Sequence, residues 1–407
     1  MARFAYTLTA TALRPAWITV AVVCVAEILS MMPFSMFLAL QPRLQDAWML
    51  SNTASGWISS AYFTGYMLAV PVLGGLTDRI DARRVWLGAC VLAGVGSLGF
   101  AVLADGTWSA VLLQLLTGAG LAGTYMPGLK VITDRLAETP RPRHVAFYTT
   151  SFTIGSSLSF WIIGSLGSAL SWRTAVAMSA AGPAVGCLLV WLLLPAVHVA
   201  PHAHAPPGVH VRAVLRSPDS MRYVIGYAAH VWELFALRAW VVPFLVFCQQ
   251  WRGTAPPISV ATLAAMVALI GVPSSLAGAE LTTHAPRRRI IITVMVTSIV
   301  ASLLVLPAAF GPWWLLIVAV CGYNALISAD SAALTSGIVA VAPPASRGTA
   351  MAIYSTLGFA AASAGTFAVG LTLDLLGGQS VMSWMVAFAI MSMPNLVGAL
   401  AIRRVTA

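Results

Sequence analysis

Three ionisable side chains follow one another within a single long apolar stretch of the sequence. His230 and Glu233 are three residues apart, so a helix places them as neighbours, and Arg238 returns close to the same face two turns later. Burial favours the neutral form of a carboxyl group, so Glu233 would carry a proton that His230 could share. The Arg238 guanidinium could hold an anion through charge-assisted hydrogen bonds. The stretch therefore predicts proton transfer and anion binding.

Four more polar residues lie in other apolar stretches and join the list of candidate site residues: Glu27, Gln114, Asn324 and Asp330. An ionisable group at the centre of a bilayer costs about 2.5–3.5 kcal/mol, so such groups usually face a cavity or a partner. Glu27 is a second candidate proton carrier. The alternative is structural: Arg238 would pair with Glu233 or Glu27 to hold helices together, or would extend to the membrane interface.

The composition is that of an integral membrane protein. The chain has 407 residues, of which 59% are hydrophobic and 8% charged, and its mean hydropathy is +0.88. A soluble domain has about 25% charged residues. The five cysteines all lie in apolar stretches without a paired spacing and are expected to be small core residues, not disulfides or metal ligands.

A membrane-spanning helix needs about 20 mainly apolar residues. The sequence predicts an all-α integral membrane protein with twelve transmembrane helices in two pseudo-symmetric six-helix halves. The halves are residues 1–196 and 221–407, joined by a cytoplasmic linker at 197–220 that is rich in proline and histidine. Metal binding by these histidines is the weaker alternative, and no cofactor is expected. The predicted helices are 17–39, 54–76, 85–104, 108–133, 146–170, 174–196, 222–248, 258–280, 290–310, 312–342, 349–376 and 380–402.

The basic residues set the orientation. With twelve spans, eighteen of the 22 Lys and Arg residues lie on the side of both termini and three lie on the other, with Arg238 inside a span. Basic residues concentrate on the cytoplasmic side, so both termini are predicted to be cytoplasmic. The same bias explains the net charge of +10 without nucleic acid as a partner.

A charged loop between the second and third spans, residues 74–84, carries five charges in eleven positions. The equivalent place in the second half, residues 278–289, also has a glycine, then an acid (Glu280), then an arginine cluster. The correspondence indicates a duplicated six-helix unit, and transporters are commonly built from such repeats.

The loop resembles a motif of the major facilitator superfamily, Gly-x-x-x-Asp-Arg-x-Gly followed by basic residues. Gly74, Asp78, Arg79, Arg83 and Arg84 match it in order, whereas Asp81 replaces the second glycine. The resemblance covers the whole chain. It implies transport by alternating access, with spans one, four, seven and ten lining a central cavity. These spans carry Glu27, Gln114, the three residues of span seven, Asn324 and Asp330. By the same resemblance, the loop and Glu280 act in gating.

The sequence differs from the motifs of particular subgroups of the family, so it does not decide the substrate or the mode of coupling. Gln114 occupies a place where many members have an arginine tied to proton coupling, and span five lacks the Gly-Pro of drug–proton antiporters. The leading expectation is a secondary transporter of a small anion, organic or inorganic, with a proton as a candidate partner. The alternatives are proton-coupled efflux of drugs or metabolites, and a membrane sensor or assembly factor that does not transport. No nucleotide-binding loop is present. The chain is expected to be a monomer in a bacterial inner membrane, and not an enzyme.

Overall fold

The computed structural model describes residues 16–136, 142–197, 207–343 and 346–406, and all the regular structure in these ranges is helical. The first half contains α1 (Ala16–Ser30), the 3-10 helix η1 (Met32–Ser35), α2 (Gln41–Trp48), α3 (Asn52–Leu76), α4 (Ala82–Leu103), α5 (Thr107–Arg135), α6 (Pro142–Ala169), α7 (Trp172–Ser179) and α8 (Ala181–Leu193). A short helix, α9 (Pro207–Leu215), follows. The second half contains α10 (Pro218–Arg252), α11 (Val260–Leu269), α12 (Gly271–His284), α13 (Arg287–Ala309), α14 (Trp313–Ala329), α15 (Ser331–Val341), α16 (Arg347–Leu375), α17 (Val381–Ser392) and α18 (Pro394–Arg403).

All of these helices except α2 and α9 belong to twelve spans in the described part of the chain, which confirms the predicted number of spans. Four spans consist of two consecutive helices each (α7–α8, α11–α12, α14–α15 and α17–α18), and α1 continues into η1. Eleven spans in the described chain are long and apolar enough to cross a membrane. The twelfth is α3, which has 25 residues but carries many serines and glycines. It packs between α5 and α16, so little of its surface needs to face lipid.

Proline explains where one of the divided spans breaks. Pro394 begins α18 and has no backbone N–H, so the carbonyl of Ile390 loses its helical donor. Trp232 of α10 supplies the missing hydrogen bond, with its Nε1 3.0 Å from that carbonyl oxygen. The break between α14 and α15, at Asp330, has no proline to explain it.

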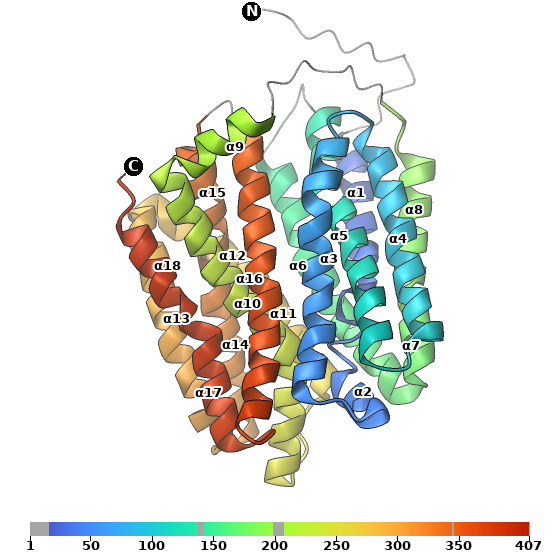
Figure 1. The fold of residues 1–407 in the computed structure, drawn as a ribbon, viewed down its shortest axis with the longest axis vertical. Coiled ribbons are helices and arrows are strands. Elements are labelled where there is room, and N and C mark those ends of the chain that lie inside the picture. Colours follow the sequence, from blue (N-terminus) through green and yellow to red (C-terminus); the bar gives the residue numbers. More distant parts are fainter. Residues whose placement is uncertain (1–15, 137–141, 198–206, 344–345, 407) are drawn as a thin grey trace, which may run out of the picture.

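The two halves lie side by side, α1 to α8 on one side and α10 to α18 on the other (Figure 1). Across the boundary α3 packs along α16 and α6 packs along α11. These are spans two with eleven and five with eight, so a shift of six spans exchanges one pair for the other. The interface therefore has the symmetry of the duplication.

Close crossings inside the halves repeat in the same way. A side chain on Gly118 of α5 would collide with the backbone carbonyl of Tyr62 on α3, and one on Gly278 of α12 would collide with that of Ala329 on α14. The first crossing joins spans two and four, and the second joins spans eight and ten. Glycine is required at both because the helix backbones touch there.

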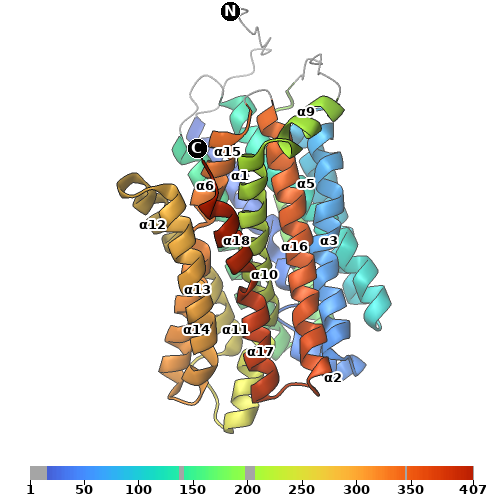
Figure 2. The ribbon, with the colours of Figure 1, turned by 60° about the vertical axis from the view of Figure 1, so that its left-hand side comes forward.

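The ends of the bundle differ. The short helix α9, the start of α16 and the end of α18 lie at one end, and α2 lies at the other (Figures 1 and 2). We call these the α9 end and the α2 end. Helix α9 lies within the predicted linker, where it contacts α10 and α16. His198, His202 and His204 of that linker lie outside the described residues.

Candidate functional site

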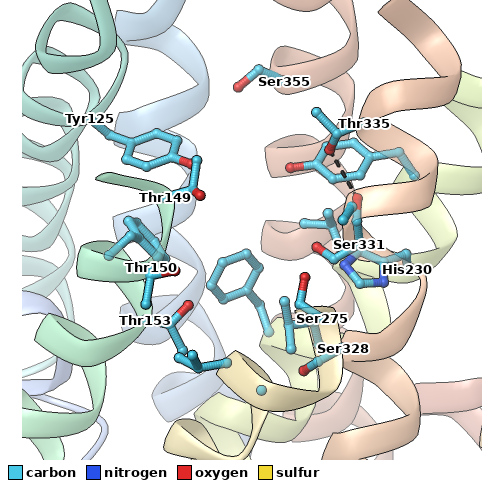
Figure 3. Close-up of a pocket in the computed structure, with 18 of the residues that line it drawn as sticks. Tyr125, Thr149, Thr150, Thr153, His230, Ser275, Ser328, Ser331, Thr335 and Ser355 are labelled. Atoms are coloured by element: carbon cyan, nitrogen blue, oxygen red, sulfur yellow. Dashed lines mark hydrogen bonds between the residues drawn. The ribbon is translucent and has the colours of Figure 1, made fainter. Parts of the chain in front are cut away.

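A cavity of about 580 Å³ lies between the two halves. Its walls come from α3, α5 and α6 of the first half and from α10, α12, α14, α15 and α16 of the second (Figure 3). The lining reaches from Phe235 and Arg238, near the middle of α10, to Ala279 and Val339, close to the ends of α12 and α15. Both of these ends lie at the α9 end, so the cavity opens toward that end.

Aromatic rings close the opposite side of the cavity. Phe34 of η1 lies 6.3 Å from the ring of Phe235 and 6.4 Å from that of Phe63, and these rings come from both halves. Nearer the α2 end, the Ser157 hydroxyl of α6 donates to the Ala265 carbonyl of α11 at 2.7 Å. The two halves are therefore in contact on the α2 side of the cavity, which is closed there and open toward the α9 end.

Arg238 lies on the cavity wall without an acidic partner. Its side chain is 4% exposed, and no described residue forms a hydrogen bond or ion pair with its guanidinium group. The guanidinium carbon lies 5.6 Å from the centre of the Phe235 ring, a weak cation–π contact. Since an uncompensated buried charge is costly, this group is poised to bind an anion.

His230 also lines the cavity, and it has an acidic partner behind it. Its Nδ1 lies 2.7 Å from Oδ1 of Asp330, at the junction of α14 and α15. Its ring stacks on Tyr227 at 5.9 Å, and Tyr227 stacks on Tyr354 at 3.7 Å. His230 and Asp330 are both about 2% exposed. The pair thus joins the cavity wall to the break in span ten.

Glu233 points away from the cavity. Its carboxylate accepts hydrogen bonds from the Tyr323 hydroxyl (2.9 Å), the Ser298 hydroxyl (3.1 Å) and the side-chain amide of Asn395. These donors come from α14, α13 and α18. Glu233 and Arg238 are five residues apart, which turns their side chains about 140° from each other on a helix. Contrary to the sequence prediction, His230, Glu233 and Arg238 therefore do not share one helix face. The alternative ion pairs, Arg238 with Glu233 or with Glu27, do not form either among the described residues.

The remaining candidates from the sequence do not line the cavity. Both carboxyl oxygens of Glu27 are buried without a hydrogen-bond partner, close to the hydroxyls of Tyr148 and Thr124. Gln114 is buried with its Oε1 unpaired, and the Asn324 side chain donates to the Val267 carbonyl at 2.6 Å. Asn324 thus ties α14 to α11, whereas Glu27 has no structural bond to explain its place.

The charged loop lies at the α9 end, where its residues contact the first half. Asp78 lies 3.8 Å from Lys130. Asp81 accepts from the backbone N–H of Arg83 at 2.9 Å and lies 3.3 Å from Arg135, so it both caps α4 and joins an ion pair. Arg83 donates to the carbonyls of Val190 and Trp191. A side chain at Gly74 would meet no other atom within 4 Å. The side chains of Arg79 and Arg84 form no hydrogen bond or ion pair with the described residues, and their backbone N–H groups donate to Leu76 and Asp81. In the second half, Glu280 is exposed and lies 3.4 Å from His284.

Hydroxyl side chains cover much of the cavity wall, and the sequence interpretation did not include them. Thr149, Thr150 and Thr153 project from α6, and Ser275, Ser328, Ser331, Thr335 and Ser355 lie on the opposite wall (Figure 3). Ser336 of α15 also lines the cavity. The signal was present in the sequence, because positions 328, 331, 335 and 336 recur at helical spacing and so share one face.

The chain belongs to the major facilitator superfamily: the model of the Major Facilitator Superfamily matches residues 23–366. Among individual proteins, the chain is similar to "Protein spinster homolog 3" of Danio rerio, with 25% identity over 256 residues that cover 60% of this chain and 51% of the relative. It is also similar to the "3-(3-hydroxy-phenyl)propionate transporter" of Escherichia coli (strain K12), with 33% identity over 168 residues, 40% of this chain and 41% of the relative. The chain thus spans about half the length of the first of these relatives, and less of the second.

Solved structures agree on the fold. The crystal structure of the nucleoside transporter NupG superimposes with a TM-score of 0.75 at 18% identity, covering 95% of this chain and 98% of that one. At this identity the likeness shows the fold alone. The expected fold class and family are confirmed by these comparisons.

Proposed function

We propose that this protein is a secondary transporter that moves a small organic anion across the membrane by alternating access. The observation that carries the proposal is Arg238, a buried guanidinium on the cavity wall with no acidic partner among the described residues. None of the described residues that line the cavity is acidic. An anion in the cavity would supply the missing counter-charge through charge-assisted hydrogen bonds.

The size and chemistry of the cavity favour an organic anion over an inorganic one. A volume of about 580 Å³ is typical of sites for small organic molecules. Phenyl rings of Phe152, Phe235 and Phe359 lie beside the hydroxyls of α6 and α15. This lining suits a carboxylate on an aromatic body that carries hydroxyl groups. The Escherichia coli relative is named for such a compound, 3-(3-hydroxyphenyl)propionate, which is our choice as the first probe.

We place the α9 end on the cytoplasmic side of a bacterial inner membrane. The α9 end carries the arginines of the charged loop, of the start of α13 and of the end of α18. Basic residues concentrate on the cytoplasmic side of membrane proteins. With this orientation, the structure corresponds to an inward-open state.

Glu27 is our candidate for a proton-binding site. Both of its carboxyl oxygens are buried without a hydrogen bond or ion pair to a described residue, and the hydroxyls of Tyr148 and Thr124 lie close to them. A proton taken up there on one side of the membrane and released on the other would couple transport to the pH gradient. Glu233 is less suited to this role, because three donors hold its carboxylate.

The test is uptake into sealed proteoliposomes that contain the purified full chain. We expect saturable uptake of labelled 3-(3-hydroxyphenyl)propionate, stimulated by an imposed pH gradient, and competition by other aromatic carboxylates but not by the neutral amide. Arg238→Gln should abolish uptake, and Arg216→Gln, which changes an exposed arginine outside the cavity, should not. Folded protein that transports no organic anion from a panel, or an Arg238→Gln variant with normal uptake, would overturn the proposal.

A further inference from the structure

The charges on the cavity wall come from two side chains at different depths. Arg238 and His230 are the basic residues among the described lining, and they lie eight residues apart on α10. Eight residues of helix span about 12 Å. Asp330 lies directly behind His230, with 2.7 Å between Nδ1 and Oδ1. Arg238 has no such partner, so the two basic groups differ in the charge they present to a substrate.

With one proton between them, His230 and Asp330 are neutral as a pair. The pair is neutral when the imidazole is charged and the carboxylate ionised, and also when both groups are uncharged. Arg238 then contributes the single uncompensated positive charge of the wall. A substrate with one negative charge would match it, whereas a second negative charge would be buried without a partner, which is costly at low dielectric.

We propose that the site selects anions that carry one negative charge, and that Asp330 sets this selectivity by cancelling the charge of His230. The inference rests on the proposed function and adds the charge class of the substrate. Asp330 does not line the cavity, so it acts through His230 as a positioning and charge-balancing residue. The hydroxyls of Ser328 and Ser331, on either side of Asp330 in sequence, face the cavity and would bind neutral polar groups of the substrate.

The other titratable groups near His230 are the same in the wild-type protein and in an Asp330→Asn variant. They are the phenols of Tyr227 and Tyr354, which stack beside the imidazole, and Glu233 and Arg238 on its own helix. Glu233 keeps its three hydrogen-bond donors on the far side of α10. A change at Asp330 therefore alters one charge while the others are constant.

The experiment compares two probes of similar shape with the purified full chain. One is 3-(4-hydroxyphenyl)propionate, a monoanion, and the other is 3-(4-sulfophenyl)propionate, whose two negative charges lie at opposite ends of the ring. Titration calorimetry measures binding at about pH 6 and about pH 8, which bracket the range in which histidine changes its charge. The wild-type protein should bind the monoanion at least about 10-fold more tightly than the dianion at about pH 6.

Asp330→Asn should reverse this preference under acidic conditions. The variant lacks the carboxylate that balances a positive charge on the imidazole, so dianion affinity should rise about 10-fold at about pH 6, where histidine is more often cationic, and fall back at about pH 8. The double variant His230→Gln/Asp330→Asn is the matched control. It keeps Arg238 and should bind the monoanion at both pH values without gaining the dianion.

Each outcome separates the inference from the proposed function. Equal affinity of the wild-type protein for the two probes overturns the charge selectivity and leaves anion transport standing, and this comparison needs no variant. A folded Asp330→Asn protein that binds the monoanion but gains no dianion affinity overturns the role of Asp330. If no anion binds more tightly than the neutral amide of the monoanion, the proposed function itself is wrong.

Discussion

Asp374, near the end of α16, binds the first turn of α3 at Asn52, in the other half of the protein. One carboxylate oxygen accepts from the backbone N–H of Asn52 at 3.1 Å and from its side-chain amide at 2.8 Å, and the other accepts from the N–H of Thr53 at 2.7 Å. Ser51 accepts from Ala54. The free N–H groups of a helix start are thus satisfied partly across the interface, where the helix dipole also favours an anion.

This contact must break when the halves separate at the α2 end, so Asp374→Asn should favour that separation. Loss of the charge-assisted bonds at this half-exposed site is expected to shift the equilibrium by about 1–2 kcal/mol, or about 5- to 30-fold. Ser59 is buried on α3, two turns from Tyr66 on the same face and nearer the α2 end. With the native cysteines replaced, Ser59→Cys should react faster with a membrane-impermeant maleimide when Asp374 is also changed.

Asp105→Asn is the matched control for this measurement. Asp105 lies between α4 and α5 at the same end and bonds to Ser109 within its own half. It should leave the labelling rate unchanged. An Asp374→Asn rate equal to that of the control would show that the contact does not hold the halves together.

The unpaired charge of Arg238 predicts a conflict between function and stability. Arg238→Met removes a buried cation that no carboxylate balances, so the empty protein should gain about 1–3 kcal/mol while losing anion binding. In a thermal unfolding scan, the variant should melt higher than wild type without ligand and should not respond to an added anion. Arg216→Met, an exposed change, should stay within about 0.5 kcal/mol of wild type. A lower melting temperature for Arg238→Met would mean that the guanidinium is stabilised by the protein itself.

Glu27→Gln should separate exchange from accumulation. The amide resembles the protonated acid, so exchange of labelled for unlabelled substrate should continue, whereas accumulation driven by a pH gradient should be lost. Proteoliposomes measure both in the same preparation. Asp105→Asn, at an exposed acid between α4 and α5, serves as the control and should keep accumulation. If Glu27→Gln still accumulates substrate in response to the gradient, the proton site lies elsewhere.

Glu233 should behave as a structural residue and not as a binding residue. Glu233→Gln replaces an acceptor with an amide that opposes the donors of Asn395 and Ser298, so it should destabilise the protein by about 2–4 kcal/mol. The affinity for the anion should change less than about twofold, because the side chain does not reach the cavity. Chemical denaturation and calorimetry check the two values. Normal stability with lost affinity would return Glu233 to the site.

The sequence predicted the twelve spans and the two halves because hydropathy over about 20 residues is a signal that tertiary packing seldom overrides in a bilayer. Arg238 and His230, which line the cavity, could be selected from the sequence because an ionisable residue in a membrane span is costly and usually faces a cavity or a partner. Glu233 was wrongly expected to share a face with Arg238. The spacing of each residue from His230 was considered, but not the five-residue spacing between Glu233 and Arg238. The serines and threonines were missed because they also serve close helix packing, and their shared face is visible only when the cavity is known.

Asp78, at the α9 end, is a second carboxylate near the boundary between the halves, as Asp374 is at the α2 end. In this structure it lies 3.8 Å from Lys130 of its own half. We expect it to move to the start of α16, near Arg347 and Gly348, when the α9 end closes, since that helix start would favour a carboxylate. Asp78→Asn should therefore slow net transport several-fold and leave the equilibrium affinity for the anion within about twofold, because the cavity is unchanged. Transport and binding are measured on the same protein. A loss confined to affinity, with normal turnover at saturation, would contradict a gating role for Asp78.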